Sequence, residues 1–170
     1  MSLEGEKRYL YFQIRSASKK DYPNLLDITA AGHILAHETI SEGIREVKEE
    51  LGLDIPFEQF ISLGIIDYSV KQNDFIDNEL AHAFIYLCNS SFDQFEVQSE
   101  EVSGIVRAEF DLFCDLWSGR REDVKIEGFE IIGGKREHIN KTVVKNAFVQ
   151  HSEAYYSQIL SSIREKLEAT

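Results

Sequence analysis

The sequence predicts an α/β protein in which a β-sheet is covered by helices. A glycine loop leads into an amphipathic, glutamate-rich helix over residues 40–51. Runs of β-branched and aromatic residues at 7–15 and 80–88 predict strands. Residues 141–168 carry periodic apolar positions and predict a helical C-terminal segment. Strands and helices mixed in this way favour a sheet packed between layers of helices.

The remaining elements follow from the same patterns, in chain order. The first strand is followed by a polar turn at 19–24 and by a second strand at 25–29, which ends in the Gly32 loop. The segment 124–132 is ambiguous, because glycines interrupt it. The other expected elements are strands at 60–70 and 102–108, a break at 73–74 and a helix at 111–118.

The helix over residues 40–51 has clear local signals at both ends. Thr39 is followed three residues later by Glu42, which indicates a capping box with Thr39 as the N-cap. Gly52 directly follows the last helical residue and favours a left-handed C′ position. Pro56 lies shortly beyond and discourages any continuation.

Three glutamates of this helix share one side. Glu46 and Glu50 are one turn apart, and Glu49 lies beside them. Like charges at these spacings repel by a few tenths of a kcal/mol per pair. One interpretation is an ordinary solvated face. The other is that a divalent cation offsets the repulsion, since carboxylate oxygens suit Mg²⁺ or Mn²⁺.

Length and charge restrict the class of protein. A chain of 170 residues is expected to form one domain, residues 1–170, in which residues 1–5 are expected to be a remnant of cloning. A net charge of −12 argues against broad nucleic-acid binding. No apolar run reaches the roughly 18 residues that would predict a membrane span.

The two cysteines, Cys88 and Cys114, lie in apolar or aromatic surroundings. Core thiols are therefore expected, rather than a disulfide or a metal-binding pair. A reducing, cytoplasmic location is the corresponding expectation.

The helix and its loop resemble the Nudix box, whose family pattern is G-x5-E-x7-R-E-U-x-E-E-x-G-U, with U an aliphatic residue. One departure is visible, because six residues rather than seven separate Glu38 from Arg45. The departure concerns Glu38 more than the second half of the motif, which matches without a gap. The patterned positions are occupied by Gly32, Glu38, Arg45, Glu46, Val47, Glu49, Glu50, Gly52 and Leu53.

The resemblance extends beyond the box. Gln13-Ile14-Arg15-Ser16 is similar to the "QxRS" corner that precedes the box in many Nudix enzymes. Phe148-Val149-Gln150-His151 and Tyr155-Tyr156 resemble an ending of the isopentenyl-diphosphate isomerase-like Nudix subgroup. The resemblance implies an α/β/α sandwich with a mixed β-sheet. It also implies a strand upstream of residue 7, for which too few residues are expected to remain.

The resemblance assigns roles to residues of the box. Glu46 and Glu50 are the first candidates for ligands of Mg²⁺ or Mn²⁺, with Glu49 as a third ligand or as the catalytic base. Arg45 is expected to orient these carboxylates rather than to touch substrate. A backbone carbonyl of Ala31 or Gly32 is a further candidate ligand.

Residues outside the box are candidates as well. Many Nudix enzymes add an acidic residue from elsewhere, and Glu100 and Glu101 are the leading candidates, with Glu79 as the runner-up. Arg15 is a candidate for binding a substrate phosphate through its planar fork, or else a surface arginine at a strand edge. His33 and His37 flank the glycine loop but lack a compelling ligand spacing.

The resemblance therefore predicts a metal-dependent hydrolase that cleaves the pyrophosphate linkage of a nucleoside-diphosphate-type small molecule. An isopentenyl-diphosphate isomerase is one alternative, although no cysteine lies at 25–33, where its nucleophile is expected. A nucleotide-sensing Nudix module without catalysis is another. The expected partner is a small-molecule diphosphate, without a membrane, and a homodimer is a family-level expectation.

Overall fold

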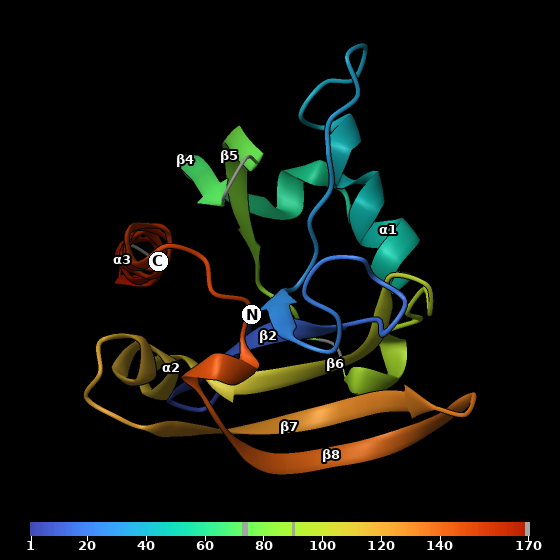
Figure 1. Ribbon diagram of the computed structural model, residues 1–170, viewed down its shortest axis with the longest axis vertical. Helices are drawn as coiled ribbons and strands as arrows, with labels where there is room; N and C mark the ends of the chain where they lie inside the picture. The colour runs from blue at the N-terminus through green and yellow to red at the C-terminus, as the bar shows by residue number, and fades with distance from the viewer. Residues whose placement is uncertain (73–74, 90, 169–170) are drawn as a thin grey trace. The chain divides into compact units, whose positions relative to one another are not determined.

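The computed structural model describes residues 1–72, 75–89 and 91–168, and over residues 68–72 and 75–79 it describes the backbone alone. The chain forms two compact units (Figure 1). Unit 1 comprises Met1–Phe57 and Leu87–Val149, and unit 2 comprises Glu58–Tyr86 and Gln150–Thr170. The Nudix-box helix and all residues of the candidate site described below belong to unit 1.

Unit 1 is built on one six-stranded sheet with the order β1-β2-β6-β7-β8, in which β3 also pairs with β2. Every ladder in this sheet is antiparallel, so the expected mixed sheet is wrong for the strands described. The parallel pairing in this unit is an isolated bridge between Leu26 and Phe148. The strands are β1 (Ser2–Glu4), β2 (Lys7–Arg15), β3 (Leu26–Ile28), β6 (Val102–Glu109), β7 (Asp123–Ile132) and β8 (Lys135–Val144).

The strand that was expected to be missing upstream of residue 7 is present as β1. It pairs with the first residues of β2, from Ser2 opposite Tyr9 to Glu4 opposite Lys7. The Tyr11 hydroxyl donates a hydrogen bond to Ser2 Oγ at 3.2 Å. A strand of three residues is sufficient here, because β1 has to pair only with the first part of β2, and β3 pairs with the later part.

The second half of the chain contains more strand than the sequence predicted. The ambiguous segment 124–132 lies in β7, and the segment expected to be helical from residue 141 begins instead within β8. Gly133 and Gly134, both with positive φ, form the two-residue turn of this hairpin. The β-branched residues that end β8 fit the pleated strand. The C-terminal helix, α3, spans only Glu153–Glu168.

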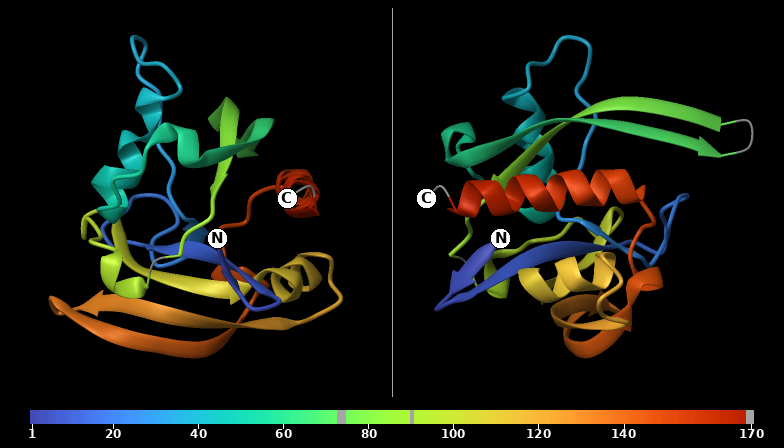
Figure 2. Two further views of the ribbon diagram at one scale, coloured as in Figure 1. Left: turned by 180° about the vertical axis from the view of Figure 1, so that it is seen from behind. Right: turned by 90° about the vertical axis from the view of Figure 1, so that its left-hand side faces the viewer.

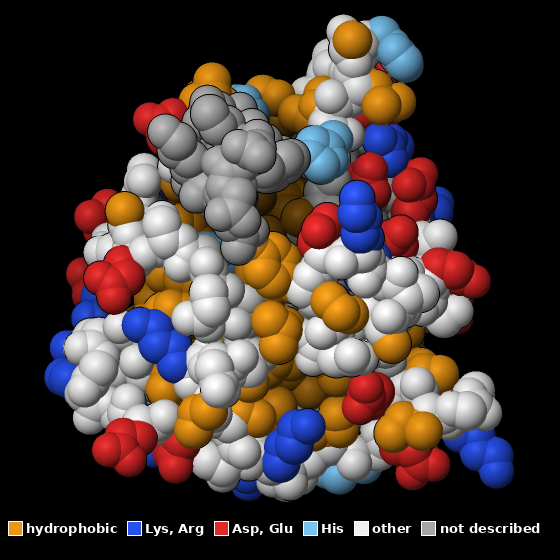
Figure 3. Space-filling view, in the orientation of Figure 1, with side chains coloured by type: hydrophobic (Ala, Val, Ile, Leu, Met, Phe, Trp, Pro, Cys, Tyr) orange, Lys and Arg blue, Asp and Glu red, His pale blue; other side chains and the backbone are white. Residues whose placement is uncertain are grey.

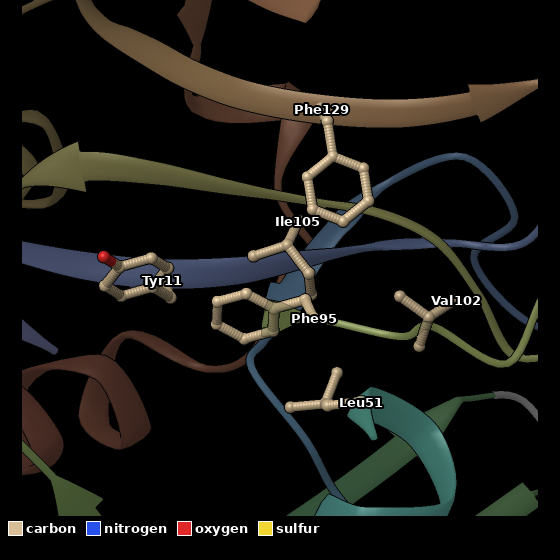
Figure 4. Close-up of a cluster of buried hydrophobic side chains, with 6 residues drawn as sticks. All are labelled: Tyr11, Leu51, Phe95, Val102, Ile105 and Phe129. Carbon is tan, nitrogen blue, oxygen red and sulfur yellow. The ribbon is translucent and has the colours of Figure 1, made fainter. Parts of the chain in front are cut away.

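Two buried clusters hold unit 1 together, one of which contains residues of α2 (Phe110–Trp117), the helix predicted at 111–118. The rings of Phe12, Phe113 and Phe148 pack against one another, with centroids 4.7–5.2 Å apart. The other cluster joins the sheet to Leu51 of the box helix (Figure 4). It consists of Tyr11, Leu51, Phe95, Val102, Ile105 and Phe129.

Unit 2 combines a long hairpin with the C-terminal helix. Strands β4 (Phe60–Gln72) and β5 (Phe75–Tyr86) pair antiparallel, with a register shift between Ser62 and Gly64. They correspond to the predicted strands at 60–70 and 80–88, although β5 begins earlier and ends at Tyr86. Helix α3 runs beside the hairpin and contacts β4 (Figure 2).

Both cysteines are buried, as expected for core thiols. Among the described helices, none is both long enough and apolar enough to cross a membrane.

The aromatic cluster around Phe148 generates a stability prediction. Phe148 has no exposed surface, and Phe12 and Phe113 contact its ring. Phe148→Ala is expected to lower the free energy of unfolding by about 3–5 kcal/mol, because it leaves a cavity between the two remaining rings. Urea unfolding followed by circular dichroism measures this change. Val144→Ala, at a side chain that is 48% exposed, is the control and should cost less than about 1 kcal/mol. Equal losses in the two variants would contradict the packing.

Candidate active site

The box helix ends at Leu51 as predicted, but it begins at Glu42 rather than at residue 40, and it has two parts. A 3-10 turn over Glu42–Ile44 leads into α1, which spans Arg45–Leu51. The two reciprocal bonds of the capping box are present, because the Thr39 amide donates to Glu42 Oε2 at 2.8 Å and the Glu42 amide donates to Thr39 Oγ1 at 3.4 Å. The residue at the N-cap of the 3-10 turn is, however, Ser41 rather than the predicted Thr39. Gly52 ends the helix in the left-handed region with a φ of 72°, also as predicted.

The C-terminal end of α1 is anchored to the segment that precedes β6. The Glu96 amide donates to the Leu51 carbonyl at 2.9 Å, and the Gln98 amide donates to the Glu50 carbonyl at 3.0 Å. Two of the carbonyls that every helix leaves without a partner at its end are therefore satisfied. Since Leu51 is buried in the core cluster, the position of Glu50 is determined by the core.

The three glutamates of α1 differ strongly in their exposure. Glu49 is 55% exposed and Glu46 is 21% exposed at the side chain, whereas Glu50 is only 7% exposed. We call these three residues the carboxylate cluster. Acidic and basic side chains lie side by side over α1 in the space-filling view (Figure 3). A simple solvated face is excluded for Glu50, because its carboxylate is buried.

Arg45 connects the carboxylate cluster to the preceding loop. Its Nε and Nη2 donate to the two carboxylate oxygens of Glu38 at 2.7 and 3.3 Å, and its Nη1 donates to Glu46 and, at 3.1 Å, to Glu49. The hydrogen bonds to Glu38 and Glu46 raise the pKa of Arg45 further above its usual range. The predicted role of Arg45 in orienting carboxylates agrees with this geometry.

Glu38 keeps its place despite the shortened loop. Besides its two bonds from Arg45, it accepts a hydrogen bond from the Leu35 amide at 2.8 Å. The bond from Arg45, followed by that from Leu35, lowers the pKa of Glu38 below its usual value. The loop therefore absorbs the missing residue without separating Glu38 from Arg45.

Glu50 is a buried carboxylate with an unsatisfied oxygen. Its Oε2 has no hydrogen-bond partner among the described residues, and the Ala31 backbone donates a hydrogen bond to the carboxylate. Burial raises the pKa of Glu50 to about 7; the negative charges of Glu46 and Glu101 act in the same direction, and Lys19 opposes them. An ionised carboxylate in this position calls for a positive charge.

Gly32 provides the space that Glu46 occupies. A Cβ atom added at Gly32 would lie 2.1 Å from Glu46 Cγ and 2.7 Å from Glu46 Oε1. Any larger residue would therefore displace the carboxylate. The requirement for glycine at this position of the box follows directly from this contact.

Glu101 is the acidic residue outside the box that the structure brings to the cluster. It lies close enough to raise the pKa of Glu50, and its carboxylate pairs with Lys19 Nζ. The carboxylate of Glu100, the other leading candidate, accepts a hydrogen bond from Ser99 at the surface. The side chain of Glu79, the runner-up, lies outside the described residues.

Lys19 was missed by the sequence analysis, which treated it as part of a polar turn. The structure places it beside the carboxylate cluster because the loop after β2 is tied to residues 100–101. The Ser16 amide donates to the Glu101 carbonyl at 2.9 Å, and Ser18 Oγ donates to the Glu100 carbonyl at 3.0 Å. No spacing rule in the sequence connects residue 19 with residues 50 and 101.

Arg15 has structural partners in this structure. Its Nη1 donates to Asp27 Oδ2 at 3.0 Å, and its Nε and Nη2 both donate to the Asp21 carbonyl, at 3.1 and 2.8 Å. These bonds connect β2 with the turn that follows it and with β3. Its expected contact with a substrate phosphate remains a prediction.

The donor set fits a divalent cation, although its carboxylates are not gathered into a preformed metal-binding group. No group of three Asp, Glu, His or Cys side chains in the described part of the chain is arranged to hold a metal ion. Arg45 binds Glu46 and Glu49 instead. The buried, unsatisfied oxygen of Glu50 and the space over Gly32 for Glu46 nevertheless suit a hard cation with oxygen ligands.

Comparisons with known proteins agree with this site. No protein-family model matches the chain. The chain is 35% identical over 163 residues to an uncharacterized Nudix hydrolase of Clostridium acetobutylicum, covering 95% of this chain and 79% of that protein. It is 30% identical over 129 residues to Nudix hydrolase 3 of Arabidopsis thaliana, covering 73% of this chain but only 16% of the plant protein. It is 47% identical over 72 residues to an uncharacterized Nudix hydrolase of Listeria innocua, covering 38% and 43% of the two chains.

The relatives, with which the glutamate-rich helix behind a glycine loop agrees, show the class of protein, an enzyme that acts on acid anhydrides. The chain belongs to the Nudix hydrolase family. That family generally uses divalent metal ions.

The buried carboxylate of Glu50 generates a prediction on stability and pH. A raised folded-state pKa stabilises the fold below about pH 4.5, and this contribution is lost as the pH rises through about 7. In the presence of EDTA at pH 8, the free energy of unfolding of Glu50→Gln, measured by urea unfolding, is therefore expected to exceed that of the wild type by roughly 1–3 kcal/mol. At pH 5 the two proteins should differ little. Glu49→Gln, at an exposed position, is the control and should show no such gain. Parallel pH dependence of the wild type and Glu50→Gln would contradict the buried charge.

Proposed function

We propose that this protein is a metal-dependent pyrophosphohydrolase that cleaves the diphosphate linkage of a nucleoside-diphosphate-type small molecule. The observation that carries the proposal is the buried carboxylate of Glu50, with one oxygen lacking a partner, beside Glu46 and under the Ala31–Gly32 loop. The finer features of the family, a single domain over residues 1–170 and an α/β/α sandwich, are part of the same proposal.

Glu46 and Glu50 would hold Mg²⁺ or Mn²⁺, with Glu49 as a third ligand or as the catalytic base. When bound, the cation supplies positive charge that stabilises the charge developing on the diphosphate oxygens. The protein has a net charge of −12, so an anionic substrate needs this local positive charge.

The side chains of the site have separate tasks in this proposal. Glu49 is the most exposed carboxylate of the cluster, and its carboxylate is the candidate base that removes a proton from the attacking water. Arg45 holds the carboxylates in place through bonds to Glu38, Glu46 and Glu49 and is not assigned a contact with substrate. Lys19 is the cation that can meet a phosphate oxygen, because it lies beside Glu101 and Glu50.

The two alternatives lack a specific supporting observation. An isomerase of this family would need a reactive cysteine, but Cys88 and Cys114 are 4% and 8% exposed. A sensing module without catalysis would not need the complete set of Glu46, Glu49 and Glu50.

A substrate panel tests the proposal directly. Product release would be measured with Mg²⁺ or Mn²⁺ on nucleotide sugars, ADP-ribose, dinucleoside polyphosphates, nucleoside triphosphates and isopentenyl diphosphate. Glu49→Gln and Glu50→Gln are each expected to lower kcat by about 10²-fold or more, because they remove the base or a ligand. Glu96→Gln, an exposed glutamate outside the cluster, is the control and should retain activity.

Three results of this panel would contradict the proposal. Allylic isomerisation of isopentenyl diphosphate without phosphate release would establish the isomerase alternative. Tight nucleotide binding by folded protein without cleavage would establish the sensing module. Cleavage that persists in EDTA would exclude metal dependence.

Lys19 generates a separate kinetic prediction. Lys19→Ala is expected to raise the KM for the substrate by about tenfold while kcat changes less, because a phosphate contact is lost from ground and transition states alike. Lys20→Ala, at the exposed neighbouring lysine, is the matched control. If Lys19 only supports Glu101, the metal concentration needed for half-maximal activity would rise instead and the KM would stay unchanged.

A further inference from the structure

Strand β8 is an open edge of the six-stranded sheet. It is the last strand in the sheet order, ten residues long, and β7 is its single neighbour in the described structure. Nine of its ten side chains are exposed or half-exposed, and only Ile139 is buried. Helix α2 packs on β2, β6 and β7, so it leaves the outer edge of β8 accessible. A long open edge offers a row of backbone donors and acceptors to another strand.

The charges of this edge are arranged unusually. Glu137 lies directly opposite Glu130 of β7, and no ion pair to either glutamate is present among the described side chains. Like charges directly opposite each other destabilise an antiparallel pair. A lysine on the outer side of Glu137 would relieve this repulsion. Lys141 lies four residues along the same strand and on the same face.

We infer that β8 is the homodimer interface of this protein, where it pairs antiparallel with β8 of a second copy about a two-fold axis at Ile139. In this register Glu137 faces Lys141 of the partner subunit, and the symmetry creates the same ion pair twice. Lys135 then faces the partner's Val143, so no two like charges meet across the axis. The two six-stranded sheets become continuous.

The neighbouring registers that preserve the faces of the strand are less favourable. An axis at residue 137 would place Glu137 opposite the partner's Glu137, which adds to the repulsion from Glu130. An axis at residue 138 would place Lys135 opposite the partner's Lys141, which is repulsive. An axis at residue 140 would place Glu137 opposite the partner's Val143, without any ion pair. Side-chain charge therefore selects the axis at Ile139.

Lysines on an edge strand ordinarily prevent such pairing, since two copies bring their charges together. Here Glu137 and Lys141 are spaced symmetrically about Ile139, so that pairing neutralises the lysine instead. Arg136 does not interfere, because it donates to the Phe92 and Phe95 carbonyls, at 2.9 and 2.6 Å, within its own subunit.

Charge reversal tests the interface. Sedimentation equilibrium of the full chain is expected to show a dimer at tens of micromolar. Glu137→Lys and Lys141→Glu should each raise the dimer Kd by tenfold or more, because each places two like-charge pairs at the axis. The double variant E137K/K141E restores opposite charges and is expected to recover the dimer. Circular dichroism and thermal unfolding confirm that each variant is folded.

Lys125→Glu on β7 is the matched control for Lys141→Glu, because it makes the same change of net charge away from the edge. It should leave the dimer Kd unchanged. A wild type that is monomeric up to about 100 µM overturns the inference. A dimer that survives both single reversals places the interface elsewhere. Single reversals that dissociate the dimer without recovery in the double variant overturn the proposed register.

Discussion

The attachment of the C-terminal end of α1 to the core of unit 1 determines the geometry of the whole site. Leu51 is buried against the sheet, and the carbonyls of Glu50 and Leu51 accept hydrogen bonds from the backbone of residues 96–98. Because Glu50 directly precedes Leu51, its carboxylate is held in a buried position where charge is costly. The glycine loop, Arg45 and Lys19 are then arranged around a carboxylate that cannot move into solvent.

The charged side chains of the site do not fully compensate one another within the protein. Arg45 compensates Glu38, Glu46 and Glu49, and Lys19 compensates Glu101. Among the described residues, a backbone amide is the one hydrogen-bond donor to Glu50, and its pKa rises to about 7. A carboxylate that is expensive to ionise in the folded protein favours binding of a cation, because the cation removes the unfavourable charge.

The sequence predicted the parts of the protein that depend on local spacing. The structure confirmed the reciprocal bonds of Thr39 and Glu42, the end of the helix at Leu51 and the left-handed Gly52, because each depends on residues within one or two helical turns. The C-terminal segment was predicted wrongly in its first part. There, a glycine turn pairs β7 with β8, and this tertiary pairing overrides the helical period.

Contacts between distant residues could not be predicted in the same way. Lys19 approaches Glu50 only because β2 and β6 are neighbours and bring the loops at their ends together. The bonds of Arg15 to Asp27 and to the Asp21 carbonyl are likewise not revealed by spacing alone, and its contact with a substrate phosphate stays a prediction. The sequence pattern understated the role of Glu38, because it counts the residues between Glu38 and Arg45. The ion pair requires only that the segment between them is long enough to bring the two side chains together.

The two segments that border the site differ in how freely they can change length during evolution. Residues 96–102 are bound to α1 at one end, and the Glu101 and Val102 amides both donate to the Gln98 carbonyl at the other. An insertion there would shift Glu101 relative to Glu50 while leaving every residue of the box in place. The segment between Glu38 and Arg45 is one residue shorter than the family pattern, and Arg45 still donates to both carboxylate oxygens of Glu38, so the loss of one residue is absorbed there. Diversification by insertion and deletion is therefore open to the segment between Glu38 and Arg45 and closed to the segment that leads into β6.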